Sequence, residues 1–182
     1  MKTESSAAYI ARLAITLLLI TAVVAAGLAC VNAVTSPEIE ALNAQKTQNA
    51  VEAVLPGGGE SIAFTDDSGI VSTIYKGQSG YAVEVTPAGF NGTVTMMVGV
   101  DNAGQVLGIS IVSHTETAGL GAEAAADNAA GNAFRGQFAG MSGSVSVSKD
   151  GGQVDALTGA TITSRAVCAG VNAALNAVAK LG

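Results

Sequence analysis

The most informative segment of this chain reads Asp155-Ala156-Leu157-Thr158-Gly159-Ala160-Thr161, and it continues into Ile162-Thr163-Ser164. Thr161 has a hydroxyl on a stiff β-branched side chain, which is the group a phosphate ester requires. The two residues before it add almost no bulk, and glycine can adopt the positive φ that close approach of a large group often requires. From spacing alone, the plainer interpretation is a glycine-containing turn that enters a capped helix.

The residues after this segment predict a C-terminal helix. Apolar side chains recur on one helical face, at Val167, Val171, Ala174, Leu175 and Val178. Thr163 or Ser164 is expected to cap the start of this helix. A phosphate on Thr161 would then lie close to a helix N-terminus, where unpaired N–H groups and the helix dipole favour anions.

The 155–161 segment resembles the D-x-x-(S/T)-G-A-T-x-(S/T) segment of FMN-binding domains that carry FMN as a phosphodiester on the last threonine. The resemblance is to the G subunits of Rnf-type ion-translocating electron-transport complexes, and the C subunit of the sodium-pumping NADH:quinone oxidoreductase has the same segment. It implies that Thr161 is the covalent attachment residue for FMN. It also places nearby residues in the cofactor site, namely Asp155, Thr158, Gly159, Ala160 and Thr163.

A second loop resembles the same family. His114-Thr115-Glu116-Thr117-Ala118-Gly119-Leu120-Gly121 is similar to the H-x-E-T-P-G-L-G loop, with Ala118 in place of the usual proline. The resemblance implies that this loop, Leu120 included, lies against the flavin, where Gly119 and Gly121 would let backbone N–H groups approach the ring. Glu116 and Thr117 would contact the polar edge of the ring or fix the loop, and Glu116 has the alternative of capping the next helix.

Two further residues are weaker candidates for the flavin site. His114 is a single histidine at a strand end, so it either lies near the flavin or has a structural role. Gly77-Gln78-Ser79-Gly80-Tyr81 is similar to a glycine-rich segment of the family, and Tyr81 either stacks near the ring or, more plainly, faces the core.

The N-terminal part predicts one transmembrane helix. Residues 13–34 contain no charged side chain and are long enough to cross a bilayer. Lys2 and Arg12 precede this stretch, and Glu38 and Glu40 follow it. The positive-inside bias predicts residues 1–12 in the cytoplasm, a span at 13–34 and residues 35–182 outside the cytoplasm. The competing interpretation is a cleaved signal peptide, which usually has a shorter apolar region.

Composition excludes several classes of function. The chain has 182 residues and a net charge of −6, with no cluster of Lys and Arg and few aromatic residues, which argues against nucleic-acid binding. No cluster of His, Cys and carboxylates has metal-ligand spacing, so a zinc or iron–sulfur site is not expected. Cys30 and Cys168 lie in such different contexts that no intramolecular disulfide is expected. An organic cofactor remains as the route for electron transfer.

The order of elements predicts an α+β domain with a largely antiparallel sheet and flanking helices. A helix is expected to start at Ser36-Pro37 and to stop at Pro56-Gly57. Five strands are expected at about 61–65, 69–76, 81–86, 92–100 and 105–113, joined by short turns, including one at 66–69, that favour antiparallel pairing. An alanine-rich helix at about 122–135, a strand near 144–148 and the last helix complete the pattern.

The resemblance implies an electron-carrying subunit, rather than a complete enzyme, in an ion-translocating ferredoxin:NAD oxidoreductase complex of the inner (cytoplasmic) membrane. Its partners would be the other membrane subunits of the Rnf-type complex and a flavin transferase for maturation. A covalent tether suits an exported protein, because free FMN is scarce where it could be lost. The alternatives are the C subunit of the sodium-pumping enzyme and an anchored binding module without redox activity.

Overall fold

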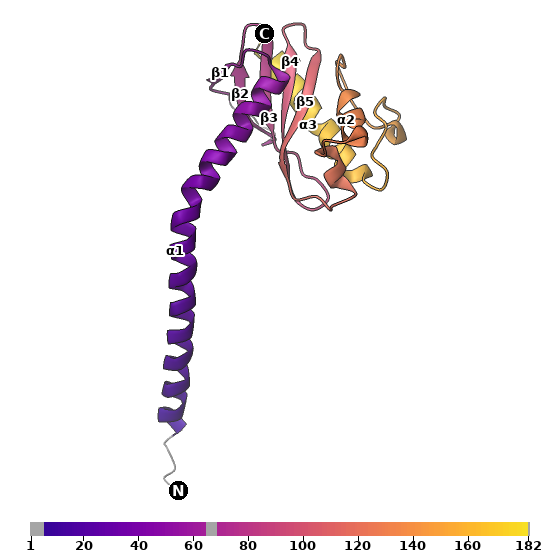
Figure 1. Cartoon of the computed structure of the whole chain (residues 1–182). Coiled ribbons are helices and arrows are strands. Elements are labelled where there is room, and N and C mark those ends of the chain that lie inside the picture. Colours follow the sequence, from indigo (N-terminus) through magenta and orange to yellow (C-terminus); the bar gives the residue numbers. More distant parts are fainter. Residues whose placement is uncertain (1–5, 65–68, 182) are drawn as a thin grey trace. The chain divides into compact units, whose positions relative to one another are not determined.

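The computed structural model describes residues 6–64 and 69–181 (Figure 1). The chain forms two compact units, Met1–Gln45 and Lys46–Gly182. The expected turn at 66–69 lies outside the described residues except for Gly69.

The first unit consists of most of one long helix, α1 (Ser6–Val54). Its 18-residue window of highest mean hydropathy reaches 2.6, and large apolar side chains such as Leu17, Leu18 and Val23 are exposed. The apolar part of this helix is suited to the hydrocarbon core of a bilayer, where exposed leucines need no protein partner. Among the described residues, α1 is the one helix with the length and hydropathy of a membrane span.

The expected helix start at Ser36 is wrong, because α1 runs through Ser36 and Pro37 without a break. Proline lacks an N–H group and so removes one helical hydrogen bond, but it does not force an end where helix-forming residues continue on both sides. Thr35, just before this proline, lies within the helix, and its Oγ1 donates to the Val31 carbonyl one turn earlier at 2.9 Å. The expected stop is correct: the helix ends at Val54, just before Pro56.

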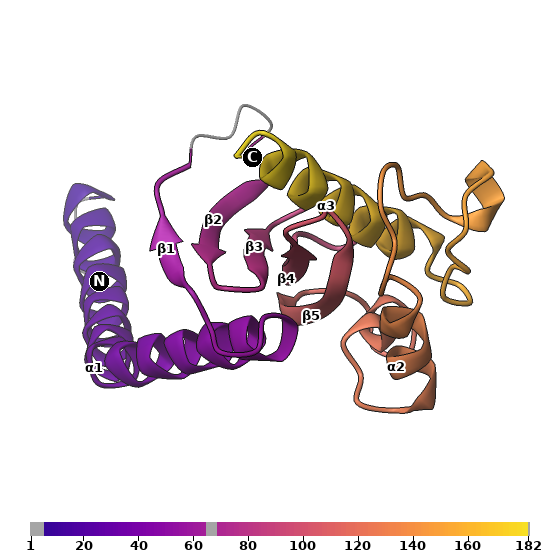
Figure 2. The same ribbon diagram turned by 90° about the horizontal axis from the view of Figure 1, so that it is seen from above.

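The second unit is built on a five-stranded sheet in the order β1-β2-β3-β4-β5, with every neighbouring pair antiparallel (Figure 2). The strands are β1 (Glu60–Ile62), β2 (Val71–Lys76), β3 (Gly80–Val85), β4 (Val94–Asp101) and β5 (Val106–His114). The five expected strands are therefore confirmed, as is their antiparallel pairing.

Helices cover both faces of the sheet. Helix α3 (Thr161–Ala179) packs on one face, where Val167 and Val171 join Val85, Met96 and other buried residues in the main core. On the other face, the last turns of α1 place Val51, Val54 and Leu55 against Ala82 and Met97. Helix α3 and the sheet approach closely at Gly170, where a Cβ atom would lie 3.1 Å from the Met96 sulfur.

The region between β5 and α3 differs from expectation in two places. The alanine-rich helix is divided into a 3₁₀ turn, η1 (Gly121–Ala124), and a short helix, α2 (Ala129–Gly136), because Asn128 caps α2 by accepting from the Gly131 N–H at 2.8 Å. The strand expected near 144–148 is absent from the described residues. Val147 forms an isolated parallel bridge with Val154, and the turn η2 (Ser148–Asp150) follows.

Candidate functional site

The 155–161 segment forms a tight turn that is fastened to the first turn of α3. Gly159 has φ +74°, the left-handed conformation that glycine adopts without strain. The Ala160 N–H donates to the Leu157 carbonyl at 3.0 Å. The Ser164 hydroxyl accepts from the Leu157 N–H and donates to the Ala160 carbonyl, both at 3.0 Å. The turn therefore presents Thr161 as the first residue of α3.

The start of α3 corrects one expectation. Neither Thr163 nor Ser164 precedes the helix as a cap; both lie inside its first turn and are buried. Position Ala160 takes the place of the cap residue and contributes no side-chain hydrogen bond. As in any α-helix, the first N–H groups of α3 lack an intrahelical acceptor, so the helix start beside Thr161 favours an anion.

The two motifs that the sequence singles out meet at one cavity of about 310 Å³. The 114–121 loop and the start of α3 both line this cavity, although they are about forty residues apart in sequence. The lining residues are Phe90, Glu116, Thr117, Leu120, Gly121, Lys149, Gly159, Ala160, Thr161, Ile162 and Thr163.

Glu116 holds this cavity together. Its side chain is buried, and one carboxylate oxygen, Oε1, accepts from the N–H groups of Phe90 at 2.8 Å and Asn91 at 3.1 Å. The other oxygen, Oε2, accepts from the Thr163 hydroxyl at 2.5 Å. Glu116 therefore joins three segments, and the alternative that it caps the next helix is wrong, because η1 has no side-chain cap and α2 is capped by Asn128.

The hydrogen bonds to Glu116 also determine its charge. Burial by itself would raise the pKa of the Glu116 carboxyl, but the hydrogen bonds from Thr163, Asn91 and Phe90, together with nearby His114, lower the pKa below its ordinary value. Glu116 is therefore a carboxylate at neutral pH, and its charge is already matched by protein donors.

Two glycines leave the room that Glu116 occupies. A Cβ atom at Gly89 would collide with Glu116 Oε1, and a Cβ atom at Gly121 would collide with Glu116 Oε2 and Thr163 Oγ1. Gly121 was expected to let its backbone approach the ring; the structure adds that it makes space for a buried carboxylate.

Thr161 is half-buried at the cavity wall and contacts a cation that sequence reasoning missed. The Lys149 ammonium donates to Thr161 Oγ1 at 3.2 Å. Lys149 lies in η2, which is tied to α3 by a bidentate ion pair between Asp150 and Arg165, with both N–O distances at 2.7 Å. One signal in the sequence could have indicated it, since Lys149 is the sole lysine between Lys76 and Lys180.

Three apolar side chains lie exposed around the cavity. Phe90 is 67% exposed, Ile162 49% and Leu120 43%, and all three belong to the cavity lining. Phe90 was also missed, because the Gly89-Phe90-Asn91-Gly92 turn gave no sign that it meets the other two motifs. A cavity lined by a hydroxyl, an ammonium, a helix start and apolar side chains fits a phosphate attached to a flat aromatic group.

The remaining residues of the two motifs lie beside this cavity. Gly119, Asp155 and Thr158 line a neighbouring cavity of about 600 Å³, and Leu120 lines both. The backbone of Asp155 is held by Gln137, whose side-chain amide accepts from the Asp155 N–H at 2.7 Å and donates to its carbonyl at 3.2 Å. The Asp155 side chain is exposed, so it faces solvent.

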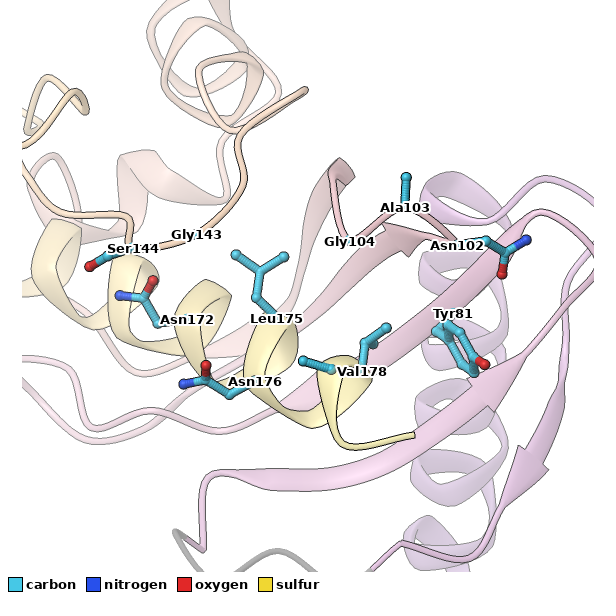
Figure 3. A pocket seen from close by; sticks show the side chains of 11 residues that line it. Tyr81, Asn102, Ala103, Gly104, Gly143, Ser144, Asn172, Leu175, Asn176 and Val178 are labelled. Atoms are coloured by element: carbon cyan, nitrogen blue, oxygen red, sulfur yellow. The ribbon is translucent and has the colours of Figure 1, made fainter. Parts of the chain in front are cut away.

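Two candidates lie outside both cavities. His114 ends β5 and lines neither cavity, and its buried Nδ1 has no hydrogen-bond partner among the described residues. Tyr81 lines a separate cavity of about 730 Å³ with Leu175 and Val178 (Figure 3). Leu175 and Val178 lie in the last turns of α3, whereas Thr161 is its first residue, so the cavity that Tyr81 lines is at the other end of this helix.

Comparisons with known proteins agree with these motifs. The family model of the FMN-binding domain matches residues 89–176. The chain is 32% identical to the G subunit of the ion-translocating oxidoreductase complex of Methanosarcina acetivorans over 182 residues, which cover 93% of this chain and 94% of the relative. It is 34% identical to the G subunit of the Na(+)-translocating ferredoxin:NAD(+) oxidoreductase complex of Acetobacterium woodii, with 88% and 87% covered.

A third relative matches over a shorter range. The G subunit of the proton-translocating ferredoxin:NAD(+) oxidoreductase complex of Clostridium ljungdahlii is 42% identical over 102 residues, which cover 54% of this chain and 52% of the relative. The names of the second and third relatives differ in the coupling ion, so similarity to them does not select sodium or protons for this chain.

Proposed function

Because this chain belongs to the family of G subunits of ion-translocating oxidoreductase complexes, we propose that it carries electrons through FMN in a membrane complex of that type. The match to the FMN-binding domain supports FMN as the cofactor, and the names of the relatives support membership in such a complex. FMN provides one- and two-electron redox chemistry, whereas the protein positions the cofactor and sets its surroundings. The chain is therefore one carrier in a path that other subunits begin and end.

The finer part of the proposal is that FMN is attached covalently to the Thr161 hydroxyl. The observation that carries it is the meeting of both motifs at the cavity where Thr161 lies. Nearby hydroxyls are less suited to attachment. Thr163 is buried and donates to Glu116, and Ser164 is buried and donates to the Ala160 carbonyl, whereas Thr158 lines the neighbouring cavity.

The cavity residues then have distinct roles toward FMN. The helix start of α3 would favour the phosphate on Thr161, and Glu116 fixes the 114–121 loop, because both of its oxygens already accept hydrogen bonds from the protein. The apolar side chains of Phe90, Leu120 and Ile162 are available to cover the flat ring and to exclude water from it. We assign Thr117 and the Gly119–Gly121 backbone to the same wall.

Attachment requires a maturation partner, and we propose a flavin transferase that recognises the exposed Asp155 side chain. The backbone at Asp155 is held by Gln137, so the fold does not depend on the Asp155 carboxylate. Asp155→Asn should leave the melting temperature unchanged and slow FMN incorporation. Gln137→Ala is the matched comparison, because it should lower both. Normal FMN incorporation into Asp155→Asn would contradict recognition of the Asp155 side chain by the transferase.

For the membrane, we propose a single pass in the inner membrane with residues 35–182 outside the cytoplasm. The apolar part of α1 supports the span, and the charges on either side of it support the orientation. In this position the domain lies on the side of the membrane opposite to cytoplasmic FMN, which gives the covalent bond its physical purpose.

The test of the proposed function is the flavin itself. Full-length protein co-expressed with a flavin transferase should be yellow after purification and should fluoresce in a denaturing gel. Thr161→Ala should lose the in-gel fluorescence, whereas Ser142→Ala, which removes an exposed hydroxyl outside both motifs, should keep it. A colourless wild-type protein would favour the anchored binding module without redox activity, and fluorescence that survives in Thr161→Ala would place the bond elsewhere.

A further inference from the structure

We propose that Lys149 is a binding residue for the cofactor phosphate: it holds the Thr161 hydroxyl before FMN is attached and neutralises the phosphodiester afterwards. This inference rests on the proposed attachment at Thr161. Neither of the two recognised motifs contains Lys149, and sequence reasoning assigned it no role.

The first observation is the contact itself. Lys149 Nζ lies 3.2 Å from Thr161 Oγ1 and donates to it. An ammonium has three donors, so two remain for other oxygens at the same place. When Oγ1 becomes an ester oxygen, the non-bridging oxygens of the phosphodiester stand next to it, within the reach of the same ammonium.

The second observation is the absence of a competing carboxylate. The chain has 14 acidic and eight basic residues. In the part of the chain that the structure describes, the ion pairs are Arg135–Asp127 and Arg165–Asp150, and no carboxylate pairs with Lys149. Lys149 is also the one basic residue in the lining of the Thr161 cavity. Its charge is therefore available for an anion that the cavity receives.

The third observation is that the backbone of Lys149 is fixed before any ligand binds. Asp150, the next residue, forms a bidentate ion pair with Arg165, which lies one helical turn after Thr161. Gly151 ends the η2 turn with φ +83°, and the bridge between Val147 and Val154 closes its base. Two neighbouring residues of η2 thus contact α3, Lys149 at Thr161 and Asp150 at Arg165. Because the backbone is already fixed, only the Lys149 side chain has to be ordered when the phosphate binds.

The attachment step balances without a redox partner. The Thr161 oxygen forms a bond to the FMN-side phosphorus of FAD, the pyrophosphate P–O bond breaks, AMP leaves, and the hydroxyl proton is released. The product is a phosphodiester with one negative charge. Lys149 keeps Oγ1 at the cavity wall by donating to it, and it stabilises the charge that stays on the protein after AMP has left.

The experiment measures the rate at which the full-length chain takes up FMN from FAD, Mg²⁺ and a purified flavin transferase, followed by in-gel fluorescence. Lys149→Met retains the side-chain length but removes the charge, and we expect a rate about tenfold lower, which corresponds to the loss of one charged hydrogen bond. Lys149→Arg should restore most of the rate. Lys76→Met is the matched control, because it removes one exposed lysine from β2 of the same unit.

The dependence of the uptake rate on ionic strength distinguishes an electrostatic role of Lys149 from a purely structural one. The difference between wild type and Lys149→Met should shrink as salt is added, because salt screens an exposed charge. The two Lys149 variants should melt at the wild-type temperature, since the contact of this side chain with Thr161 is a single exposed hydrogen bond. Equal rates for wild type and Lys149→Met would overturn the inference, and so would a slow Lys149→Arg variant.

The same assay separates the two proposals. If wild type takes up no flavin, or if Thr161→Ala takes it up normally, the proposed attachment itself fails. If wild type is flavinylated and Thr161→Ala is not, while Lys149→Met matches wild type, only the assignment of Lys149 fails.

Discussion

At the scale of single residues, Glu116 joins three segments that are far apart in sequence: the turn at 89–92, its own loop, and the first turn of α3. Replacing it by alanine would leave two N–H groups and the Thr163 hydroxyl without their acceptor in a buried place. We expect Glu116→Ala to lower the free energy of unfolding by about 2–4 kcal/mol. Urea unfolding of the full chain in detergent, monitored by near-UV circular dichroism of the domain, measures this loss.

The charge of Glu116 adds a pH dependence. Its pKa in the folded protein lies below the ordinary value of 4.5, so its stabilising contribution is complete above that pH and is lost as the pH falls through the folded pKa. The stability difference between wild type and Glu116→Gln should therefore be large at pH 7 and should shrink as the pH falls below 4.5. A difference that stays constant across this range would show that the hydrogen-bond geometry, and not the charge, matters.

Residue identities were predictable from the sequence where a motif fixed them, and not where a contact depended on the fold. Thr161, Glu116 and Gly121 came from two motifs that do line one cavity. Thr163 was expected as a helix cap, but its hydroxyl donates to a carboxylate 47 residues away. Lys149 was missed because it is 12 residues from Thr161 in sequence, and the two side chains meet only through the fold of the η2 turn against α3.

At the scale of elements, two glycines make room for the Glu116 network from different segments, Gly89 before β4 and Gly121 at the start of η1. Gly121→Ala should lower both the stability and the FMN content, because its Cβ would displace the Glu116 and Thr163 oxygens. Gly136→Ala is the matched control: a Cβ atom there meets nothing within 4 Å, and in helix α2 it should be neutral or stabilising by up to ~1 kcal/mol. Equal stability of the two variants would contradict the account of the cavity.

The elements themselves show why local patterns predict some boundaries and not others. The five strands were predictable because turn sequences separate alternating apolar runs, and the sheet pairs them in chain order. Pro56 and Gly57 end α1 as expected. Ser36 and Pro37 do not begin a helix, because the residues before them are already helical and extending a helix costs less than starting a new one. The prediction of a strand at 144–148 was wrong, because this segment pairs with another segment only through the isolated bridge between Val147 and Val154.

At the scale of the whole molecule, the orientation in the membrane decides whether the exported-carrier account holds. We expect Ser142→Cys, in a Cys30→Ala background, to react with an impermeant thiol reagent in cells whose inner membrane is sealed. Ser142 is exposed, whereas Cys168 is buried and burial raises the pKa of its thiol to about 11, so it adds no background. Ala8→Cys is the control for the opposite side and should react only after the membrane is broken.

The same preparation tests whether the anchor is retained. Sequencing the N-terminus of the membrane-bound protein should find the original start, because a carrier beside membrane subunits needs its anchor. A start after residue 30 would indicate a cleaved signal peptide. Labelling of Ser142→Cys only in broken membranes would place the domain in the cytoplasm and remove the reason for a covalent tether.

Peptide mass mapping shows whether FMN is bonded to Thr161. Trypsin cleaves after Lys149 and Arg165, so residues 150–165 form one peptide that contains Thr158, Thr161, Thr163 and Ser164. In protein matured by a flavin transferase, this peptide should be heavier by one FMN less one water, and fragmentation should assign the added mass to Thr161. An unmodified peptide, or the added mass on any of the other three hydroxyl residues, would contradict the account.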